Sequence, residues 1–292
     1  MSTTVLIDKR AVRRSFDRAA ATYDAAAVLQ QEVCARSLER LQFIKHQPRR
    51  MLDAGCGTGN AWAGLSRRFP QAELLALDLA PAMLRTARSR QPWHRRWLGH
   101  LPAAICGDLE RLPLASAAID LLWSNLALQW VNDLAATLRE IRRVLAPGGL
   151  LLFTTFGPDT LKELRAAQPT PARGGFNRFT DMHDIGDMLV AAGFADPVID
   201  QEPFTLTYDD VRAVMRDLKS IGAHSAASDR PEALAGKAWL AALARNYEAF
   251  RREGRLPATF EVIYGHAWVP QPRRGPGGHR VIEIRSGGGV LP

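Results

Sequence analysis

Three glycines at alternate positions, Gly55, Gly57 and Gly59, follow a short apolar run and the acid Asp53. Glycine has no Cβ, so a chain with this spacing can turn sharply and lie against a ligand. Doubly wound folds bind adenosine cofactors at a glycine-rich turn between the first strand and the first helix. The spacing is G-x-G-x-G, whereas a dinucleotide site has G-x-G-x-x-G. Together with Asp53 it predicts a site for S-adenosyl-L-methionine, although the motif alone also fits an ordinary turn.

Two further acids stand at the ends of predicted strands. Asp78 comes 19 residues after Gly59, where an acid can accept hydrogen bonds from both ribose hydroxyls. It could instead cap the helix that Pro81 opens. Asp108 follows the third predicted strand and could accept from the adenine amino group, or serve only as a turn residue. The sequence therefore predicts one acid for the sugar and one for the base.

The loop after the fourth predicted strand completes the expected pocket. Asn125 could line the methionine part of the cofactor, and Trp130 could form a wall of the reaction chamber or be an ordinary core tryptophan. The glycine loop carries no basic residue, which suits a cofactor without a phosphate. We therefore expect the cofactor to be held by Asp53, Gly55, Cys56, Gly57, Gly59, Asp78, Leu79, Asp108, Leu109 and Asn125.

Short apolar runs alternate with helical stretches in the first half of the chain. Such alternation predicts a mainly parallel sheet covered by helices on both faces. The predicted strands are 50–54, 73–78, 103–106, 119–124 and 149–155, and the predicted helices are 59–68, 81–90 and 133–145.

The flanking regions are predicted to be more helical. Apolar residues at steps of three and four indicate a helical region over 9–45. Beyond the first half we expect helices at 159–167 and from 180 or 181 to 193, an extended segment at 195–208, a helical region over 209–254 broken around 222–231, and a last strand at 259–268.

Positive charge is concentrated in two segments. The 292-residue chain has a formal net charge of +8, of which residues 81–100 contribute +5 and residues 271–292 contribute +3. These segments could attract an acidic partner by electrostatic steering, or be solvated surface. Neither zinc-finger spacing nor an RNA-binding aromatic strand accompanies them, so no nucleic-acid partner is predicted.

The remaining composition predicts a cytoplasmic globular protein. Apolar residues make up 47% of the chain and charged residues 23%, which is ordinary for a soluble domain. Three widely spaced cysteines favour a reducing compartment over a disulfide framework. We see no secretory signal and no run of about 18 apolar residues, so no membrane association is expected. No cluster of metal ligands is predicted.

With these residues in place, the chain resembles the class I S-adenosylmethionine-dependent methyltransferases. The match covers residues 45–155, through the motifs at 52–59, 77–78, 107–109 and 147–149. The resemblance implies a doubly wound, Rossmann-like α/β fold. Its sheet has seven strands, with the last one antiparallel, and helical insertions form a lid.

A narrower resemblance covers residues 8–270 and is to the malonyl-acyl-carrier-protein O-methyltransferases of biotin synthesis. It is carried by residues 12–24, 124–130, 155–165, 177–179, 181–185 and 217–223. The resemblance implies methylation of the free carboxylate of a malonyl group, carried by acyl carrier protein or by coenzyme A. It implies one domain over 1–270: an N-terminal helical lid (1–47), a cofactor-binding core (48–155), a substrate-side lid with the remaining sheet (156–258) and the last strand (259–268). We expect a monomer, with a disordered tail at 271–292.

Methyl transfer to a carboxylate needs no general base, because a carboxyl group with a pKa of about 4 is already ionised near neutral pH. Catalysis then depends on alignment and on exclusion of water. Arg178 is the predicted carboxylate anchor, since a guanidinium binds two oxygens at once; it could also be an exposed loop residue. The Tyr23 hydroxyl could touch the cofactor or the malonyl oxygen, or merely pack. Trp130 and Phe179 are predicted as apolar walls.

Three alternatives remain open on sequence grounds. A methyltransferase could act on another small acid or a quinone ring, although ring methylation needs a base that we cannot place. The arginine-hydroxylating assembly factors of mitochondrial complex I share a Trp-Val-Asn-Asp run, present here at residues 130–133, and would act on a partner protein. A cofactor-binding scaffold without turnover is the third.

Overall fold

A seven-stranded sheet forms the centre of the molecule in the computed structural model, which describes residues 6–93, 97, 101–169, 179–220 and 237–271. The spatial order is β3-β2-β1-β4-β5-β7-β6. β7 runs antiparallel to both of its neighbours, while the other six strands share one direction. This confirms the predicted fold class. The strands are β1 (Arg50–Ala54), β2 (Glu73–Asp78), β3 (Ala103–Cys106), β4 (Ile119–Ser124), β5 (Leu145–Phe156), β6 (Ala195–Tyr208) and β7 (Leu256–Trp268).

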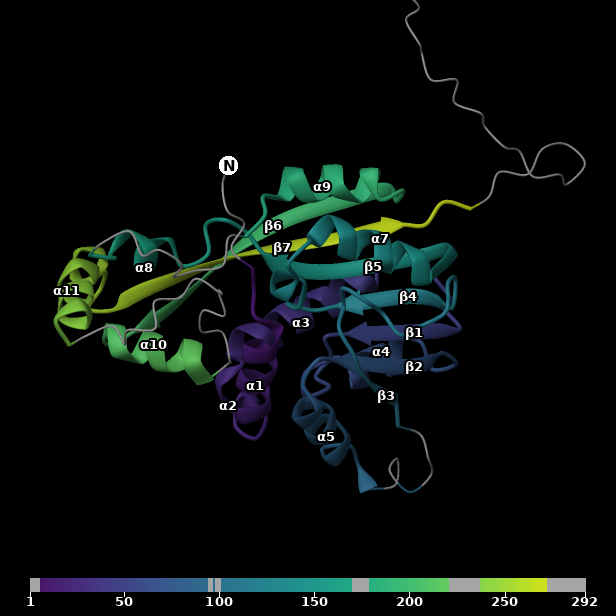
Figure 1. Ribbon diagram of the computed structural model, residues 1–292, viewed down its shortest axis with the longest axis horizontal. Coiled ribbons are helices and arrows are strands. Elements are labelled where there is room, and N and C mark those ends of the chain that lie inside the picture. The colour runs from purple at the N-terminus through teal and green to yellow at the C-terminus, as the bar shows by residue number, and fades with distance from the viewer. Residues whose placement is uncertain (1–5, 94–96, 98–100, 170–178, 221–236, 272–292) are drawn as a thin grey trace, which may run out of the picture.

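Helices cover both faces of this sheet (Figure 1). Side chains of α3, α4 and α5 pack on one face, and those of α7 and α9 pack on the other. The described helices are α1 (Lys9–Ala19), α2 (Tyr23–Ala26), α3 (Val28–Leu41), α4 (Trp62–Arg68), α5 (Pro81–Ser89), α7 (Leu134–Val144), α8 (Lys162–Ala166), α9 (Met182–Ala191), α10 (Val211–Ser220) and α11 (Lys237–Tyr247), with 3-10 turns η1 (Leu128–Trp130) and η2 (Glu248–Phe250).

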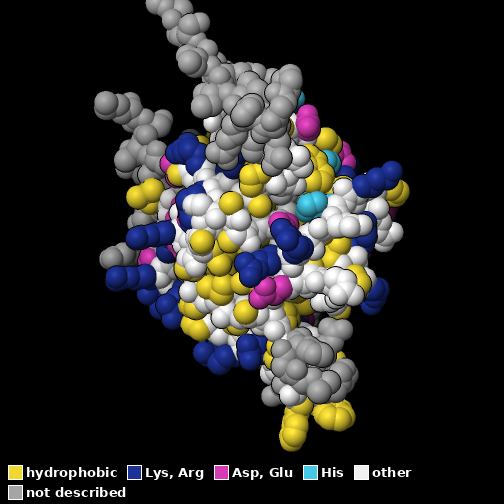
Figure 2. Space-filling view, turned by 90° about the vertical axis from the view of Figure 1, so that its right-hand side faces the viewer, with side chains coloured by type: hydrophobic (Ala, Val, Ile, Leu, Met, Phe, Trp, Pro, Cys, Tyr) yellow, Lys and Arg dark blue, Asp and Glu magenta, His cyan; other side chains and the backbone are white. Residues whose placement is uncertain are grey.

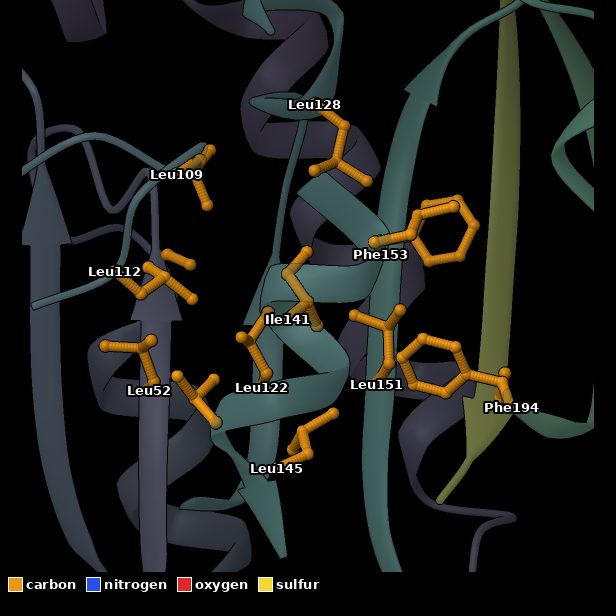
Figure 3. Close-up of a cluster of buried hydrophobic side chains, with 14 of the residues drawn as sticks. Leu52, Leu109, Leu112, Leu122, Leu128, Ile141, Leu145, Leu151, Phe153 and Phe194 are labelled. Atoms are coloured by element: carbon orange, nitrogen blue, oxygen red, sulfur yellow. The ribbon is translucent and has the colours of Figure 1, made fainter. Parts of the chain in front are cut away.

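The largest apolar cluster lies between the central strands and α7. Figure 3 shows Leu122 and Leu151, from adjacent strands, facing Ile141 of the helix, with Phe153 and Phe194 closing the side toward β7. The labelled side chains are buried, so the positions of β1, β4 and β5 are fixed by close packing. The carboxyl ends of these strands are therefore a rigid base for any site built there.

A second apolar cluster lies around the far ends of β6 and β7, which extend well beyond the other strands (Figure 1). α8, α10 and α11 gather around these ends. Val214 of α10 and Leu243 of α11 are buried there with Phe260 of β7. The C-terminal half thus adds a helical lobe on the side toward which the carboxyl ends of β1, β2 and β4 point.

Several predicted boundaries differ from the structure. The helical region over 9–45 is three helices, because the chain turns after Ala19 and again at Ala27, whose ψ of 41° is not helical. β5 begins at Leu145, four residues before its predicted start, since Leu145 pairs with Ile119 of β4. β7 begins at Leu256, where it pairs with Tyr208. The predicted disordered tail lies outside the described residues, except for residue 271.

Figure 2 shows the face at the amino ends of the parallel strands, where Lys and Arg side chains are spread among apolar and uncharged groups. In the part of the chain that the structure describes, none of the helices combines the length and apolar character that a bilayer crossing requires.

Candidate active site

The glycine turn lies against the end of β2. The backbone N–H groups of Gly55 and Cys56 both donate to the carbonyl of Leu77, at 2.8 and 3.0 Å. Gly55 has φ +81°, and a Cβ there would come within 2.3 Å of the Ala127 side chain. Gly57 has φ +52° and open space on its Cβ side. A side chain at Gly55 would therefore collide with Ala127, whereas one at Gly57 would occupy the open space beside the turn.

Gly59 has a different role from the other two glycines. Its φ is +78°, and a Cβ there would come within 2.9 Å of the Trp62 ring and 3.1 Å of Ala87. It does not line either of the cavities beside the turn. Gly59 thus lets α4 and α5 pack closely under the turn.

Asp78, at the end of β2, is fixed by two backbone donors. Gly57 N–H donates to Oδ2 at 2.9 Å, and Ala80 N–H donates to Oδ1 at 2.8 Å. The helix α5 takes Ala80 as its N-cap and receives no side-chain cap, so Asp78 is not the cap considered above. Burial raises the pKa of Asp78 to about 6, although the two N–H donors oppose this effect. The carboxylate is thus held at the cavity.

The main cavity lies above the carboxyl ends of β1, β2 and β4. It encloses about 810 Å³, including its open mouth. Nine of the residues singled out from the sequence line it: Tyr23, Gly55, Gly57, Asp78, Leu79, Asp108, Leu109, Asn125 and Trp130.

A smaller polar cavity of about 440 Å³ adjoins it, and the two share Tyr23, Gln30, Gly55, Gly57 and Asn125 in their walls. We call this the polar lobe. Asp53 and Cys56 line it.

Asp53 is 2% exposed, and its Oδ2 has no hydrogen-bond partner among the described residues. Burial and the nearby charge of Asp78 raise the pKa of Asp53 to about 7, while the Trp62 indole beside it acts in the opposite direction. A buried carboxylate oxygen without a partner is costly, and a cation beside it offsets that cost. The polar lobe is therefore suited to a positively charged group.

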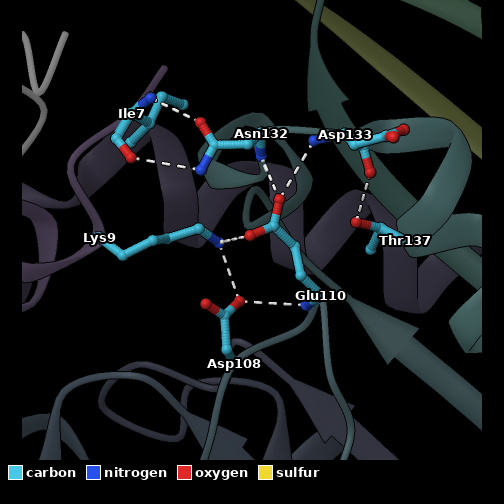
Figure 4. Close-up of polar contacts among 7 residues, drawn as sticks. All are labelled: Ile7, Lys9, Asp108, Glu110, Asn132, Asp133 and Thr137. Carbon is cyan, nitrogen blue, oxygen red and sulfur yellow. Dashed lines mark hydrogen bonds and ion pairs between the residues drawn. The ribbon is translucent and has the colours of Figure 1, made fainter. Parts of the chain in front are cut away.

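Asp108 belongs to a polar cluster that ties the N-terminal segment to the cavity rim (Figure 4). Lys9 Nζ donates to Oδ1 of Asp108 at 2.8 Å and contacts Oε2 of Glu110 at 3.0 Å. Glu110 Oε1 accepts from the backbone N–H groups of Asn132 and Asp133. These contacts place the start of α1 beside the loops after β3 and β4, so the N-terminal helices close one side of the cavity.

The aromatic candidates lie on this closing segment and opposite it. Phe16 of α1 stands edge-on to Trp130, with ring centroids 5.4 Å apart. Tyr23 lines both cavities, and its burial and the charge of Asp78 raise the pKa of its hydroxyl well above the usual range. The hydroxyl therefore stays protonated near neutral pH and can act as a hydrogen-bond donor.

A third cavity, of about 1,110 Å³, lies on the side of α9 and shares Gln129, Val131 and Phe156 with the main cavity. We call it the outer cavity. Phe179 lines it and packs edge-on against Phe156, with centroids 5.6 Å apart. No Lys, Arg or His occurs in its described lining. Arg178, the residue before Phe179 in the chain, lies outside the described residues.

Sequence reasoning missed several residues at these cavities. Lys9 and Gln30 come from the N-terminal helical region. Gln129 lies in the segment 124–130, which also contains the predicted residues Asn125 and Trp130. Their helical or loop positions gave no periodic signal. No group of three or more potential metal ligands is present within the described ranges.

The chain is similar to known methyltransferases in sequence and in structure. Residues 52–153 match the family described as methyltransferase domain. A structure of the YcgJ protein from Bacillus subtilis has a TM-score of 0.57 at 17% identity, covering 81% of this chain and 99% of that one. A putative methyltransferase from Bacillus halodurans has a TM-score of 0.54 at 19% identity, covering 82% and 99%. At these identities the structures show a common fold.

Curated relatives match over almost the whole chain. A malonyl-acyl-carrier-protein O-methyltransferase of Gallionella capsiferriformans is 56% identical, over 95% of this chain and 97% of the relative. One from Methylovorus is 58% identical, over 92% and 91%, and one from Laribacter hongkongensis is 54% identical, over 94% of each. The chain therefore belongs to the family of malonyl-acyl-carrier-protein O-methyltransferases.

Proposed function

We propose that this protein transfers a methyl group from S-adenosyl-L-methionine to the free carboxylate of a malonyl thioester carried by acyl carrier protein. The observation that carries the proposal is a cavity at the carboxyl ends of the parallel strands, lined by a glycine turn and by Asp78 and Asp108, in a chain of this family. Within the described residues, no structural observation favours the alternative acceptors or the scaffold considered above.

The described residues fit the cofactor by their chemistry. Asp78 lies at the end of β2 with its carboxylate fixed, where it can accept from ribose hydroxyls. Leu79 and Leu109 line the same cavity and can cover an adenine ring. The unpartnered Oδ2 of Asp53 in the polar lobe suits the ammonium of the amino-acid end. When bound, the cofactor supplies an electrophilic methyl group on a sulfonium.

The acceptor needs positioning rather than proton removal. A malonyl carboxyl group is ionised near neutral pH, since its reference pKa is about 4. The protonated Tyr23 hydroxyl can donate to an oxygen in the main cavity but cannot take a proton there. The remaining requirements are alignment and exclusion of water, which Trp130, Phe156 and Phe16 serve as apolar walls.

The malonyl group is expected to approach through the outer cavity. That cavity shares Gln129 with the main one, and its described walls include Phe156 and Phe179 but no cation. An arginine is suited to bind a carboxylate with two parallel hydrogen bonds. We assign this role to Arg178 because it directly precedes Phe179.

Basic residues of α5 are proposed to receive the carrier. Arg85 and Arg88 are exposed and have no ion pair with any described residue, whereas Arg90 pairs with Asp24 of α2. α5 packs against α1, where Asp17 accepts from the Ala82 N–H at 2.9 Å. Exposed cations in this position can steer an acidic carrier toward the cavity.

The test is direct transfer of label. Purified protein is incubated with methyl-labelled cofactor and malonylated carrier protein, and the label in the carrier is counted before and after mild alkaline hydrolysis. Label that enters the carrier and is released by hydrolysis as expected for a methyl ester supports the proposal. Absence of transfer to both malonyl carrier and malonyl-CoA would contradict it.

A further inference from the structure

Two glutamines at the cavities each hold a buried amide oxygen without a hydrogen-bond partner among the described residues. They are Gln30, on α3, and Gln129, on η1, and in both the unpartnered atom is Oε1. A buried polar atom without a partner costs free energy and is uncommon in folded proteins. Two of them beside one cavity point to contacts that a ligand completes.

One hydrogen-bond network fixes the backbone of Gln30, through its main-chain carbonyl, and the side chain of Gln129. Asn125 Nδ2 donates to the Gln30 carbonyl at 3.1 Å, and Thr154 Oγ1 donates to Asn125 Oδ1 at 2.9 Å. Leu126 N–H donates to Thr154 Oγ1 at 2.9 Å, and Gln129 Nε2 donates to the Leu126 carbonyl at 2.7 Å. A carbonyl can only accept, so the amide nitrogen of Gln129 must face it. Its Oε1 is therefore the atom left for a ligand.

The two glutamines differ in the cavities that they line. Gln30 lines the main cavity and the polar lobe, but not the outer cavity. Gln129 lines the main cavity and the outer cavity, but not the polar lobe. Gln30 thus lies where the main cavity adjoins the polar lobe, and Gln129 lies where it adjoins the outer cavity.

We propose that the amide oxygen of Gln129 contacts the methyl group that is transferred, and that the amide oxygen of Gln30 contacts the amino-acid end of the cofactor. This inference rests on the function proposed above. The C–H bonds of a methyl group on a sulfonium are polarised by its positive charge, so a carbonyl oxygen attracts them. The same oxygen repels a carboxylate, so the malonyl group is not its partner. Gln129 would hold the methyl group toward the outer cavity.

The test compares S-adenosylmethionine with S-adenosylhomocysteine, which lacks the methyl group and the charge but keeps the amino-acid end. Affinities are measured by calorimetry for the full-length protein and for Gln129→Leu and Gln30→Leu. Gln129→Leu is expected to weaken binding of S-adenosylmethionine about fivefold and that of S-adenosylhomocysteine less than about twofold. Gln30→Leu, as the matched control, is expected to weaken both by a similar factor.

Equal losses for the two compounds in Gln129→Leu, or no loss for either, would overturn the inference. Thermal unfolding of each variant shows whether it is folded; if Gln129→Leu is not, Gln129→Asn is used, whose shorter side chain withdraws the oxygen and predicts the same selective loss. If the unchanged protein binds neither compound, both the proposed function and this inference fail. If it binds both but Gln129→Leu shows no selectivity, only this inference fails.

Discussion

The main cavity and the polar lobe are built differently from the outer cavity. The first two are bordered by the ends of β1, β2 and β4, and their key carboxylates are held by backbone N–H groups or by close packing. The outer cavity is bordered by η1, the end of β5 and α9, with apolar residues such as Phe156 and Phe179 and no described cation.

This difference separates the half of the site proposed to bind the cofactor from the half proposed to bind the acceptor. The cofactor half uses short loops on a rigid sheet, where side chains can be placed to within a fraction of an ångström. The acceptor half uses segments that are far apart in the chain, including η1, the end of β5 and α9. We therefore expect substitutions in the two halves to affect different measurements, cofactor affinity in one and acceptor turnover in the other.

The largest effect is expected for Arg178→Ala. Removing the proposed carboxylate anchor should lower kcat/KM for malonyl carrier by about 100-fold or more, because a desolvated charged pair is worth several kcal/mol. Cofactor affinity, measured by calorimetry, should stay within about twofold.

Two controls accompany this variant. Arg178→Lys keeps the charge but loses the two-pronged geometry, and should recover only part of the rate. Arg212→Ala, at an exposed position of α10, should have no effect. Unchanged turnover in Arg178→Ala would move the carboxylate anchor to another residue.

Asp78→Ala should weaken cofactor binding at least about tenfold by calorimetry. In this variant two ribose hydroxyls lose their hydrogen-bond acceptor, and the Gly57 and Ala80 N–H groups lose theirs as well. The cofactor affinity of Asp78→Asn, which keeps one side-chain oxygen, should lie between the affinities of Asp78→Ala and the unchanged protein. Asp200→Ala, at an exposed position of β6, is the control. If Asp78→Ala binds as tightly as the unchanged protein, the acid only shapes the turn.

Asp53 should make cofactor binding depend on pH. Its pKa of about 7 lies above the unfolded value of about 3.9, so the folded protein without ligand holds a proton there that the unfolded chain has released. Stability from this group is therefore present below pH 4 and falls as the pH rises toward 7. A cationic ligand prefers the ionised form, so affinity should rise between about pH 6 and 8.

Calorimetry across this pH range, with Asp53→Asn as the comparison, checks the prediction. The variant should bind about tenfold more weakly at pH 8 and show little change with pH. A pH dependence that survives in Asp53→Asn would assign the titration to another group, such as Asp78.

The smallest effect is expected on α5. Reversing charge with Arg85→Glu and Arg88→Glu together should raise KM for malonyl carrier about fivefold, and less at high salt. Turnover of malonyl-CoA should not change, because it lacks the protein surface. Arg49→Glu with Arg67→Glu, at exposed positions outside α5, provides a control of equal charge. An equal rise in KM for both substrates would show that these arginines do not recognise the carrier.

The sheet could be predicted from sequence because its signals are local. The apolar runs, the spacing of Gly55 to Gly59 and the acids at strand ends each report on a few neighbouring residues. Five predicted strands lie within β1 to β5, and the confirmed reversal of β7 came from the family resemblance. Eight of the nine predicted residues of the main cavity follow from the same rule, since parallel strands place their carboxyl ends along one edge; Tyr23, on α2, came from the family resemblance.

The contacts that close the site could not be predicted because they join distant segments. Lys9 meets Asp108 across 99 positions, and Asn125 meets the Gln30 carbonyl across 95. The role of Gly59 could be seen only in the folded structure, because Gly59 packs against Trp62 and Ala87 and does not line the cavity. Nothing in the sequence around Gln129 showed that its amide would be oriented by Leu126.

A crystal structure with S-adenosylhomocysteine tests the central claim most directly. We predict that the sugar hydroxyls lie within hydrogen-bond distance of the Asp78 carboxylate and that the amino group enters the polar lobe toward Asp53. A ligand with its sugar bound away from the end of β2, or with its amino-acid end directed out of the polar lobe, would contradict the account.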